Sequence, residues 1–275
     1  MILVTGSTGN VGRNIVHHLL AAGEEVRALT RDPAGSGLPA GVEVVEGDFA
    51  RPDTLSTALE GVQRAFLFPV FGALDGFLGH ARGNGLERVV LLSSSAVTFP
   101  TPGWVGEAHQ RNEEEVRSSG IAATFVRPTV FMANDLAWAE QIAATGTVQG
   151  PYAKAAMAPV DERDIAAVVA AALTSQKTLD HVSLTGPQPL NQVERVRIIG
   201  EVLGIPARFE EISRDEAHAH LVRHMPAPAA DFLLDQLKSA VDGEGEAVST
   251  AESVIGRPAY TYASWVEHRI ADFRR

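Results

Sequence analysis

Three glycines at regular spacing, Gly6-x-x-Gly9-x-x-Gly12, constrain the fold of this chain more than any other feature. A short apolar run at 2–4 precedes them and is typical of a buried strand, and apolar residues at helical spacing follow at 14–22. A glycine turn between a strand and a helix presents free N–H groups at the positive end of the helix dipole, which suits a pyrophosphate. An ordinary structural turn is the alternative. The residues of this turn that we predict to bind a dinucleotide are Gly6, Thr8, Gly9, Asn10, Val11 and Gly12.

Apolar runs alternate with helical patterns over the first 130 residues. Further strands are predicted at 25–30, 42–46, 64–68, 87–92 and 122–127, with helices at 52–59, 73–82 and 107–118. This alternation predicts an α/β fold, a Rossmann-type doubly wound parallel sheet. Ligands of such sheets bind at the carboxyl ends of the strands. The residues at strand ends that should therefore line one crevice are Gly6, Arg31, Asp48, Phe68 and Ser93.

The alternation breaks after about residue 130. Helices are predicted at 165–173, 191–203, 214–223, 228–242 and 265–273, strands at 182–187 and 208–212, and an acidic loop at 242–246. We therefore predict a nucleotide-binding Rossmann core over residues 1–130. Residues 131–275 are predicted to be a mixed segment that completes the core and forms a smaller, discontinuous C-terminal substrate lobe.

Composition excludes several classes of function. The net charge of −11, from 23 basic and 34 acidic residues, argues against a nucleic-acid partner, which would need a basic face. Cysteine is absent, which excludes disulfides and thiolate metal ligands and fits a reducing compartment. The first strand starts at Met1, and no run of about 18 apolar residues occurs. We expect a cytoplasmic protein without a leader, a membrane span or a metal site, either monomeric or homodimeric.

The residue after the second strand bears on the choice of cofactor. An acidic side chain there binds a free ribose 2′-hydroxyl and selects NAD(H), whereas an arginine accommodates a 2′-phosphate. Arg31 holds this position and favours NADP(H). Asp32 adjoins it, so NAD(H) remains possible, and a solvated surface arginine is the alternative role for Arg31.

Longer motifs resemble one known family. The turn Thr5–Gly12 is similar to the nucleotide loop of extended and atypical short-chain dehydrogenase/reductases, whose cofactor is a nicotinamide dinucleotide rather than FAD. The segments 109–121, 124–128, 185–187 and 256–258, together with Asn134, resemble the NmrA-like atypical reductases in order and spacing. The resemblance spans almost the whole chain and implies a nicotinamide-dependent oxidoreductase.

This resemblance assigns further residues to the cofactor. It places Asp48 at the adenine amino group and Phe49 beside the ring, although Asp48 could instead cap the following helix. The other residues that it places along the cofactor are Phe68, Pro69, Ser93 and Pro128.

The usual proton donor of short-chain reductases, a tyrosine with a lysine four residues on, is missing. The three tyrosines, none of which has such a lysine, are Tyr152, Tyr260 and Tyr262. Ser93 and Ser94 stand where the family serine lies, and His109 stands where the isoflavone-reductase branch has its lysine. An imidazole there could bind the nicotinamide ribose or the substrate and donate a proton near neutral pH. We therefore take His109, Ser93 and Ser94 as catalytic candidates; a surface or capping role is the alternative for His109.

The most consistent function is an NADPH-dependent reductase that transfers hydride to a small conjugated acceptor, such as a quinone or an aromatic ketone. Residues considered for an apolar substrate wall are Phe99, Trp104, Phe131, Met132, Trp138 and Met157. The rival interpretation is a non-catalytic regulator of NmrA type that senses NAD(P), which the missing tyrosine favours.

Overall fold

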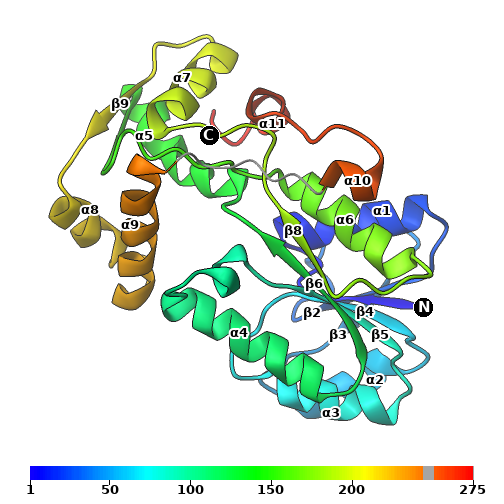
Figure 1. The fold of residues 1–275 in the computed structure, drawn as a ribbon. Coiled ribbons are helices and arrows are strands. Elements are labelled where there is room, and N and C mark those ends of the chain that lie inside the picture. The colour runs from blue at the N-terminus through cyan, green and yellow to red at the C-terminus, as the bar shows by residue number, and fades with distance from the viewer. Residues whose placement is uncertain (244–250, 275) are drawn as a thin grey trace.

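A parallel sheet with helices on both faces forms the centre of the computed structural model, which describes residues 1–243 and 251–274 (Figure 1). Its strands are β1 (Ile2–Val4), β2 (Val26–Thr30), β3 (Glu43–Glu46), β4 (Arg64–Leu67), β5 (Arg88–Leu92), β6 (Ala122–Pro128) and β8 (His181–Leu184). They pair in the order β3-β2-β1-β4-β5-β6-β8, and every pairing is parallel. The predicted doubly wound fold is confirmed.

Helices cover both faces of this sheet (Figure 1). One face carries α1 (Asn10–Ala21), α6 (Glu162–Thr174) and α10 (Ala251–Ile255), and the other carries α2 (Leu55–Leu59), α3 (Leu74–Gly83) and α4 (Gly103–Ser118). The short 3-10 helices η1 (Pro52–Thr54) and η2 (Ser95–Thr98) precede α2 and α4. Helix α4 begins at Gly103, four residues before the predicted start, because Pro102 opens its first turn.

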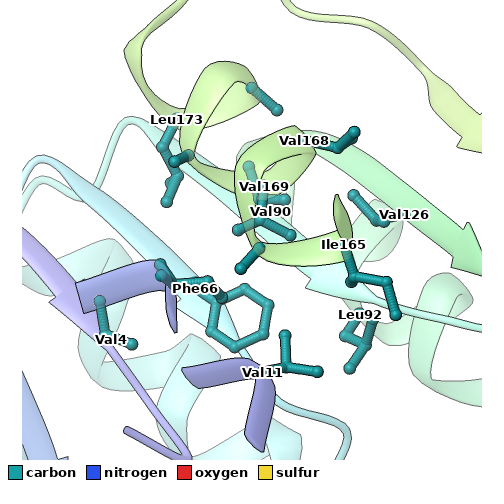
Figure 2. Packing of buried hydrophobic residues seen from close by; sticks show 14 of the residues in the cluster. Val4, Val11, Phe66, Val90, Leu92, Val126, Ile165, Val168, Val169 and Leu173 are labelled. Carbon is teal, nitrogen blue, oxygen red and sulfur yellow. The ribbon is translucent and has the colours of Figure 1, made fainter. Parts of the chain in front are cut away.

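The core follows from alternation along the strands, since successive side chains point to opposite faces. Phe66 and Val90 pack with Ile165 and Val169 of α6 on one face (Figure 2). Their neighbours, such as Leu67 on β4, pack toward α2, α3 and α4 on the other face. Burial of both faces explains why β4 and β5 are continuous apolar runs after their first residue rather than alternating with polar residues.

A second layer is built from the later part of the chain (Figure 1). Its elements are η3 (Met132–Trp138), α5 (Ala139–Thr145), β7 (Thr147–Gly150), α7 (Gln192–Leu203), β9 (Arg208–Glu211), α8 (Arg214–Leu221), α9 (Ala227–Asp242) and α11 (Tyr262–His268). Strands β7 and β9 form a separate parallel pair, and a third apolar cluster includes Met132, Ile199 and Trp265. Strand β8 and helix α6 come from the chain after residue 130 but pack with the main sheet. The division of the chain at residue 130 therefore stays a prediction.

Several elements differ from the sequence-based expectation. Residues 132–150 form η3, α5 and β7, none of which was predicted. Helix α11 starts at Tyr262 rather than 265, because the side chain of Thr261 caps it by accepting from the N–H of Ser264, and it ends at His268. The expected acidic loop at 242–246 lies outside the described residues from 244 onward. Across the described residues, no helix is both long and apolar enough to span a membrane.

Candidate cofactor and active site

The glycine turn lies where the strand order reverses, between β1 and β4. The N–H of Thr5 donates to the carbonyl of Phe66 at 3.1 Å, and its hydroxyl accepts from the N–H of Phe68 at 2.8 Å. Gly6 has φ +58°, and a Cβ there would lie 2.9 Å from Cβ of Phe68. Glycine is therefore favoured at position 6 for two reasons: the backbone is left-handed there, and the residue after β4 approaches too closely to leave room for a side chain. Ligands of doubly wound sheets bind at such a reversal point.

The other two glycines have different roles. A Cβ on Gly12 would overlap the carbonyl oxygen of Gly6, so this glycine lets α1 pack against the turn. Gly9 has an ordinary extended backbone, and a Cβ there would meet only that same oxygen, at 3.4 Å. The fold therefore does not require glycine at position 9. No side chain caps the N-terminus of α1 and its first turn has no acidic residue, so this end fits an anionic pyrophosphate.

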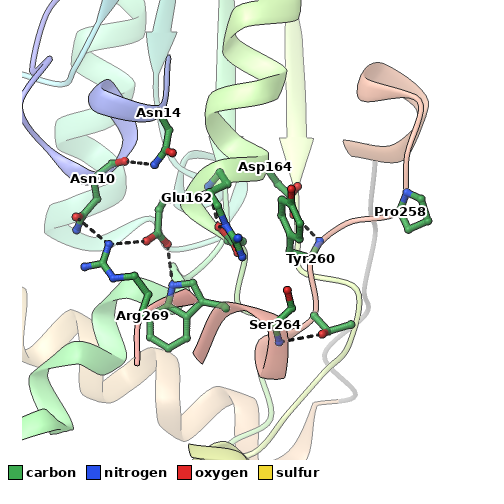
Figure 3. Close-up of polar contacts among 12 residues, drawn as sticks. Asn10, Asn14, Glu162, Asp164, Pro258, Tyr260, Ser264 and Arg269 are labelled. Atoms are coloured by element: carbon green, nitrogen blue, oxygen red, sulfur yellow. Dashed lines mark hydrogen bonds and ion pairs between the residues drawn. The ribbon is translucent and has the colours of Figure 1, made fainter. Parts of the chain in front are cut away.

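The remaining residues of the turn are divided between surface and core. Thr8 and Asn10 are exposed, whereas the side chain of Val11 is buried in the first apolar cluster. Asn10 also contacts the C-terminal part of the chain: its side-chain oxygen lies 3.4 Å from Nη1 of Arg269 (Figure 3). Arg269 pairs with Glu162 at 3.2 Å, which anchors it between α6 and the turn.

The neighbourhood of Arg31 favours a role in binding a phosphate. Its guanidinium is exposed and forms no ion pair or hydrogen bond with any residue in the described part of the chain. Asp32, which could have bound a ribose hydroxyl, instead accepts the N–H of Gly35 at 3.0 Å. Arg13 is engaged as well, because it donates to the carbonyl oxygen of Gly37 at 2.7 Å. Arg31 is therefore the uncommitted cation at the end of β2.

Asp48 and Phe49 lie after β3, but their observed contacts are within the protein. The Asp48 carboxylate accepts the N–H of Ala50 at 3.0 Å and lies 3.8 Å from Nε of Arg51, so it orders the turn before η1. Phe49 stacks on Phe77 with ring centroids 5.4 Å apart. Neither contact reaches an N–H group of η1 or of α2, so Asp48 orders the turn rather than capping a helix, and its role toward adenine remains a prediction.

His109 lies on the buried face of α4 with 8% of its surface exposed. Its ring meets Phe71 edge-on, with centroids 5.2 Å apart, and Phe71 meets Trp104 at 6.4 Å. Burial lowers the pKa of His109 to about 4, against the opposing effect of the nearby Glu113 carboxylate. The expectation of an imidazole that titrates near neutral pH is therefore wrong, because desolvation keeps this ring neutral.

A buried carboxylate that the sequence analysis missed fixes α4 to the sheet. Glu113 accepts the hydroxyl of Ser93 at 2.6 Å and two N–H groups of Arg127 at 2.8 and 2.6 Å. Arg117 donates to it at 3.1 Å. Burial tends to raise the pKa of Glu113, but the hydrogen bonds from Arg127 and Ser93 outweigh it and lower that pKa. The signal in the sequence was the spacing of four residues from His109, which sets both on one helix face.

The other predicted site residues are scattered. Ser94 accepts the N–H of Ala96 at 3.2 Å and caps η2. Pro69 is half-buried after β4, and Pro128 is the buried last residue of β6. The residues of the proposed apolar wall do not lie together. Trp104 contacts Phe71, a residue that was not among those predicted. By contrast, Met132 and Trp138 pack in the third apolar cluster and Phe131 against the first. Within the described residues, no group of side chains has the makings of a metal site.

The parallel sheet and the uncapped glycine turn at its reversal point define a dinucleotide-binding protein of Rossmann type. Residues 6–176 match the model of the NAD(P)H-binding family, and the chain belongs to that family. It is an NAD(P)H-dependent oxidoreductase, as the resemblance of its motifs implied.

Several relatives match over nearly their whole length, and two of them are more than 30% identical to this chain. The (4-alkanoyl-5-oxo-2,5-dihydrofuran-3-yl)methyl phosphate reductase of Streptomyces griseus is 37% identical, over 98% of each chain. The NAD(P)H azoreductase of Xenophilus azovorans is 31% identical, over 99% of each chain. Among solved structures, the NADPH complex of quinone oxidoreductase QOR2 from Escherichia coli superposes with a TM-score of 0.84 at 23% identity. The alignment covers 98% of this chain and 100% of that one, and the likeness supports the fold.

Proposed function

We propose that this oxidoreductase uses NADPH to reduce a flat, conjugated acceptor such as a quinone or an aromatic ketone. The observation that carries the proposal is the pair of exposed rings beside His109. Phe71 and Trp104 are 46% and 42% exposed, although large apolar side chains are normally covered. Phe71 contacts both Trp104 and the neutral imidazole of His109, at the sheet edge that holds the glycine turn. Aromatic rings at such a place suit stacking against a planar acceptor.

The choice of NADPH rests on Arg31 and Asp32. A free guanidinium after β2 matches a 2′-phosphate in charge and geometry. The Asp32 carboxylate is turned to the backbone of Gly35, so the usual selector of a free ribose hydroxyl is engaged elsewhere.

Each group of residues then has a distinct task. A bound reduced nicotinamide supplies the hydride. The turn around Gly9 and the first N–H groups of α1 bind its pyrophosphate, and Phe68 and Phe71 shield the reaction from water. His109 donates a hydrogen bond to the acceptor oxygen, where negative charge develops. Ser93 acts through Glu113, because its hydroxyl donates a hydrogen bond to that carboxylate. No tyrosine and lysine pair is needed, since a conjugated acceptor takes hydride readily.

The relatives support the acceptor class. Their names specify an acyl-substituted oxo-dihydrofuran and an azo compound, and both are electron-poor conjugated systems. The same names favour a catalyst over the non-catalytic regulator of NmrA type.

The test is NADPH oxidation by the purified protein with 1,4-naphthoquinone, acetophenone and, as a non-conjugated control, cyclohexanone. We expect turnover with the first two only. Trp104→Ala should raise the KM for naphthoquinone about 3–10-fold, the scale of one aromatic contact, and leave the Kd of NADPH unchanged. Leu179→Ala, which removes an equally exposed apolar side chain elsewhere, is the matched control and should change neither. Tight NADPH binding without oxidation by either conjugated compound would refute the proposal.

A further inference from the structure

The C-terminal part of the chain reaches the glycine turn through one arginine. Arg269 directly follows α11, and its Nη1 lies 3.4 Å from the side-chain oxygen of Asn10, the first residue of α1 (Figure 3). The same Nη1 lies 3.2 Å from Oε1 of Glu162, the first residue of α6. Arg269 therefore connects the starts of two helices, one of which carries the cofactor turn.

The guanidinium of Arg269 is held by acidic groups. Glu162 is 1% exposed and also accepts the Nε1–H of Trp265 at 3.1 Å. Oδ2 of Asp272 lies 2.7 Å from Nε of Arg269. Because two carboxyl groups already surround this one cation, Arg269 brings no free positive charge to a phosphate. We therefore expect its effect on a bound cofactor to pass through Asn10.

The contact with Arg269 determines which way the Asn10 carboxamide faces. A guanidinium can only donate hydrogen bonds, so the atom of Asn10 that meets it is the oxygen. The amide nitrogen retains two N–H donors, and no residue that the structure describes accepts a hydrogen bond from it. An exposed, oriented donor thus lies on the first residue of α1.

The same contact helps to keep the start of α1 free. Asparagine oxygens readily accept hydrogen bonds from nearby backbone N–H groups, and would then compete with a ligand for them. Here the Asn10 oxygen is engaged with Arg269, and no side chain caps the N-terminus of α1. The first N–H groups of the helix therefore stay available to an anion.

We propose that Arg269 is a positioning residue of the cofactor site. It engages the oxygen of the Asn10 carboxamide and leaves the NH2 group to donate to a pyrophosphate oxygen. The inference rests on the proposed function, which places the pyrophosphate at the glycine turn. Because NADPH and NADH share the pyrophosphate, this contact serves both cofactors alike, whereas the contact proposed for Arg31 serves only the 2′-phosphate.

The test is a double-mutant cycle on the Kd of NADPH, measured by calorimetry. Asn10→Ala removes the donor and should raise the Kd about tenfold, the scale of a hydrogen bond to a charged group. Arg269→Met removes the guanidinium and should raise it about 3–10-fold. The double variant should match Asn10→Ala within about twofold, because Arg269 acts through Asn10. Additive losses, or an unchanged Kd in Arg269→Met, would overturn the inference.

Titration with NADH separates this role from that of Arg31. Arg269→Met should weaken NADH and NADPH binding by the same factor, since the affected contact is common to both. A loss confined to NADPH would contradict a contact with the pyrophosphate. Arg269→Lys keeps the charge and a donor, so it should recover part of the affinity for both cofactors.

Arg257 provides a matched control for loss of stability. It also comes from the C-terminal part of the chain and pairs with a buried carboxylate of α6, Asp164, at 2.8 Å. It has no contact with the glycine turn among the described residues. Arg257→Met should lower the melting temperature and leave the Kd of NADPH unchanged. A rise in Kd equal to that of Arg269→Met would reveal a general effect of destabilisation and refute the positioning role.

Arg269→Met leaves the buried Glu162 without its counter-charge and could fail to fold. In that case Arg269→Met is combined with Glu162→Gln, which removes the unpaired charge and keeps an acceptor for Trp265. The combined variant should show the same rise in Kd relative to Glu162→Gln alone, and equal Kd values for the two would overturn the inference.

Gly9→Val distinguishes the inference from the placement on which it rests. Retained NADPH binding in Gly9→Val would show that the pyrophosphate lies elsewhere, and the proposed site would fail together with the inference. Abolished binding in Gly9→Val with normal binding in Arg269→Met would refute only the role of Arg269. Neither titration needs an acceptor, so both are decisive whether or not the protein reduces a quinone.

Discussion

Glu113 and Arg127 form a two-pronged ion pair between α4 and β6, with Nε 2.8 Å from one carboxylate oxygen and Nη2 2.6 Å from the other. Both side chains are largely buried, at 3% and 12% exposure. Ser93 at the end of β5 donates to the same carboxylate. One charge thus joins two strand ends to the helix that carries His109.

Glu113→Gln should destabilise the fold by about 3–5 kcal/mol, because it leaves the buried Arg127 without its counter-charge. Urea unfolding at pH 7 measures this. Glu114→Gln, on the exposed side of the same helix, is the control and should change stability by no more than about 0.5 kcal/mol. Equal losses in the two variants would mean that the ion pair adds nothing specific.

The same pair gives a pH dependence with a definite sign. The folded-state pKa of Glu113 is lowered from its ordinary value of 4.5, so its contribution to stability is fully present above that pH. The contribution is lost as the pH falls through the lowered value. The stability difference between wild type and Glu113→Gln should therefore be constant from pH 6 to 8 and shrink in acid. A difference that grew on acidification would contradict the assigned charge.

Gly9 and Gly12 should respond to substitution in opposite ways. Gly9→Val should abolish binding of NADPH and leave the melting temperature nearly unchanged, because space for a Cβ exists there until a pyrophosphate arrives. Gly12→Ala should destabilise the protein itself, since the new Cβ overlaps the Gly6 carbonyl. Calorimetry and thermal melts of both variants separate binding from folding, and retained binding in Gly9→Val would show that the phosphate site lies elsewhere.

Arg31→Ala should weaken NADPH binding by about 1–3 kcal/mol and leave NADH nearly unchanged, because a charge-assisted contact to the 2′-phosphate is lost. Titration of both cofactors decides the matter. Arg197→Ala removes an exposed arginine of α7 and should affect neither cofactor. Similar losses for NADPH and NADH would exclude a role for Arg31 in selectivity.

His109→Ala should lower turnover about 10²-fold or more, the usual scale for loss of a positioned proton donor. His109→Gln should recover part of it if hydrogen bonding at the acceptor matters. Because burial lowers the pKa of His109 to about 4, the wild-type rate should show no titration of this ring between pH 6 and 8. An inflection near pH 6.5 that vanishes in His109→Gln would show an ordinary, solvated histidine.

The main sheet was predictable because its strands are short apolar runs that alternate with helical patterns along the chain. The roles of Gly6 and Gly12 were predictable because they follow from the local geometry of the turn. Residues 132–150 were not, since β7 pairs with β9 near residue 208, and a local pattern carries no record of such a distant partner.

The residues of the active site were predicted less completely than the fold. Glu113 is one of three consecutive glutamates, and only the positions of Ser93 and Arg127 distinguish it from its exposed neighbour Glu114. Nothing in the sequence around Phe71 distinguishes it from any other aromatic residue in a loop, because its contact with His109 is made only in the folded structure. The pKa of His109 depends on burial by several elements, which its own segment does not encode.

The contact between Asn10 and Arg269 joins residues 259 positions apart. Such a contact can form only after an exceptionally long loop of chain has closed, and fast folding is associated with near neighbours in sequence. The strand and helix that flank the glycine turn can pair early, but the turn gains this last support only when α11 has docked. Competence to hold a dinucleotide should therefore appear among the final events of folding, after the bulk of the sheet has already formed.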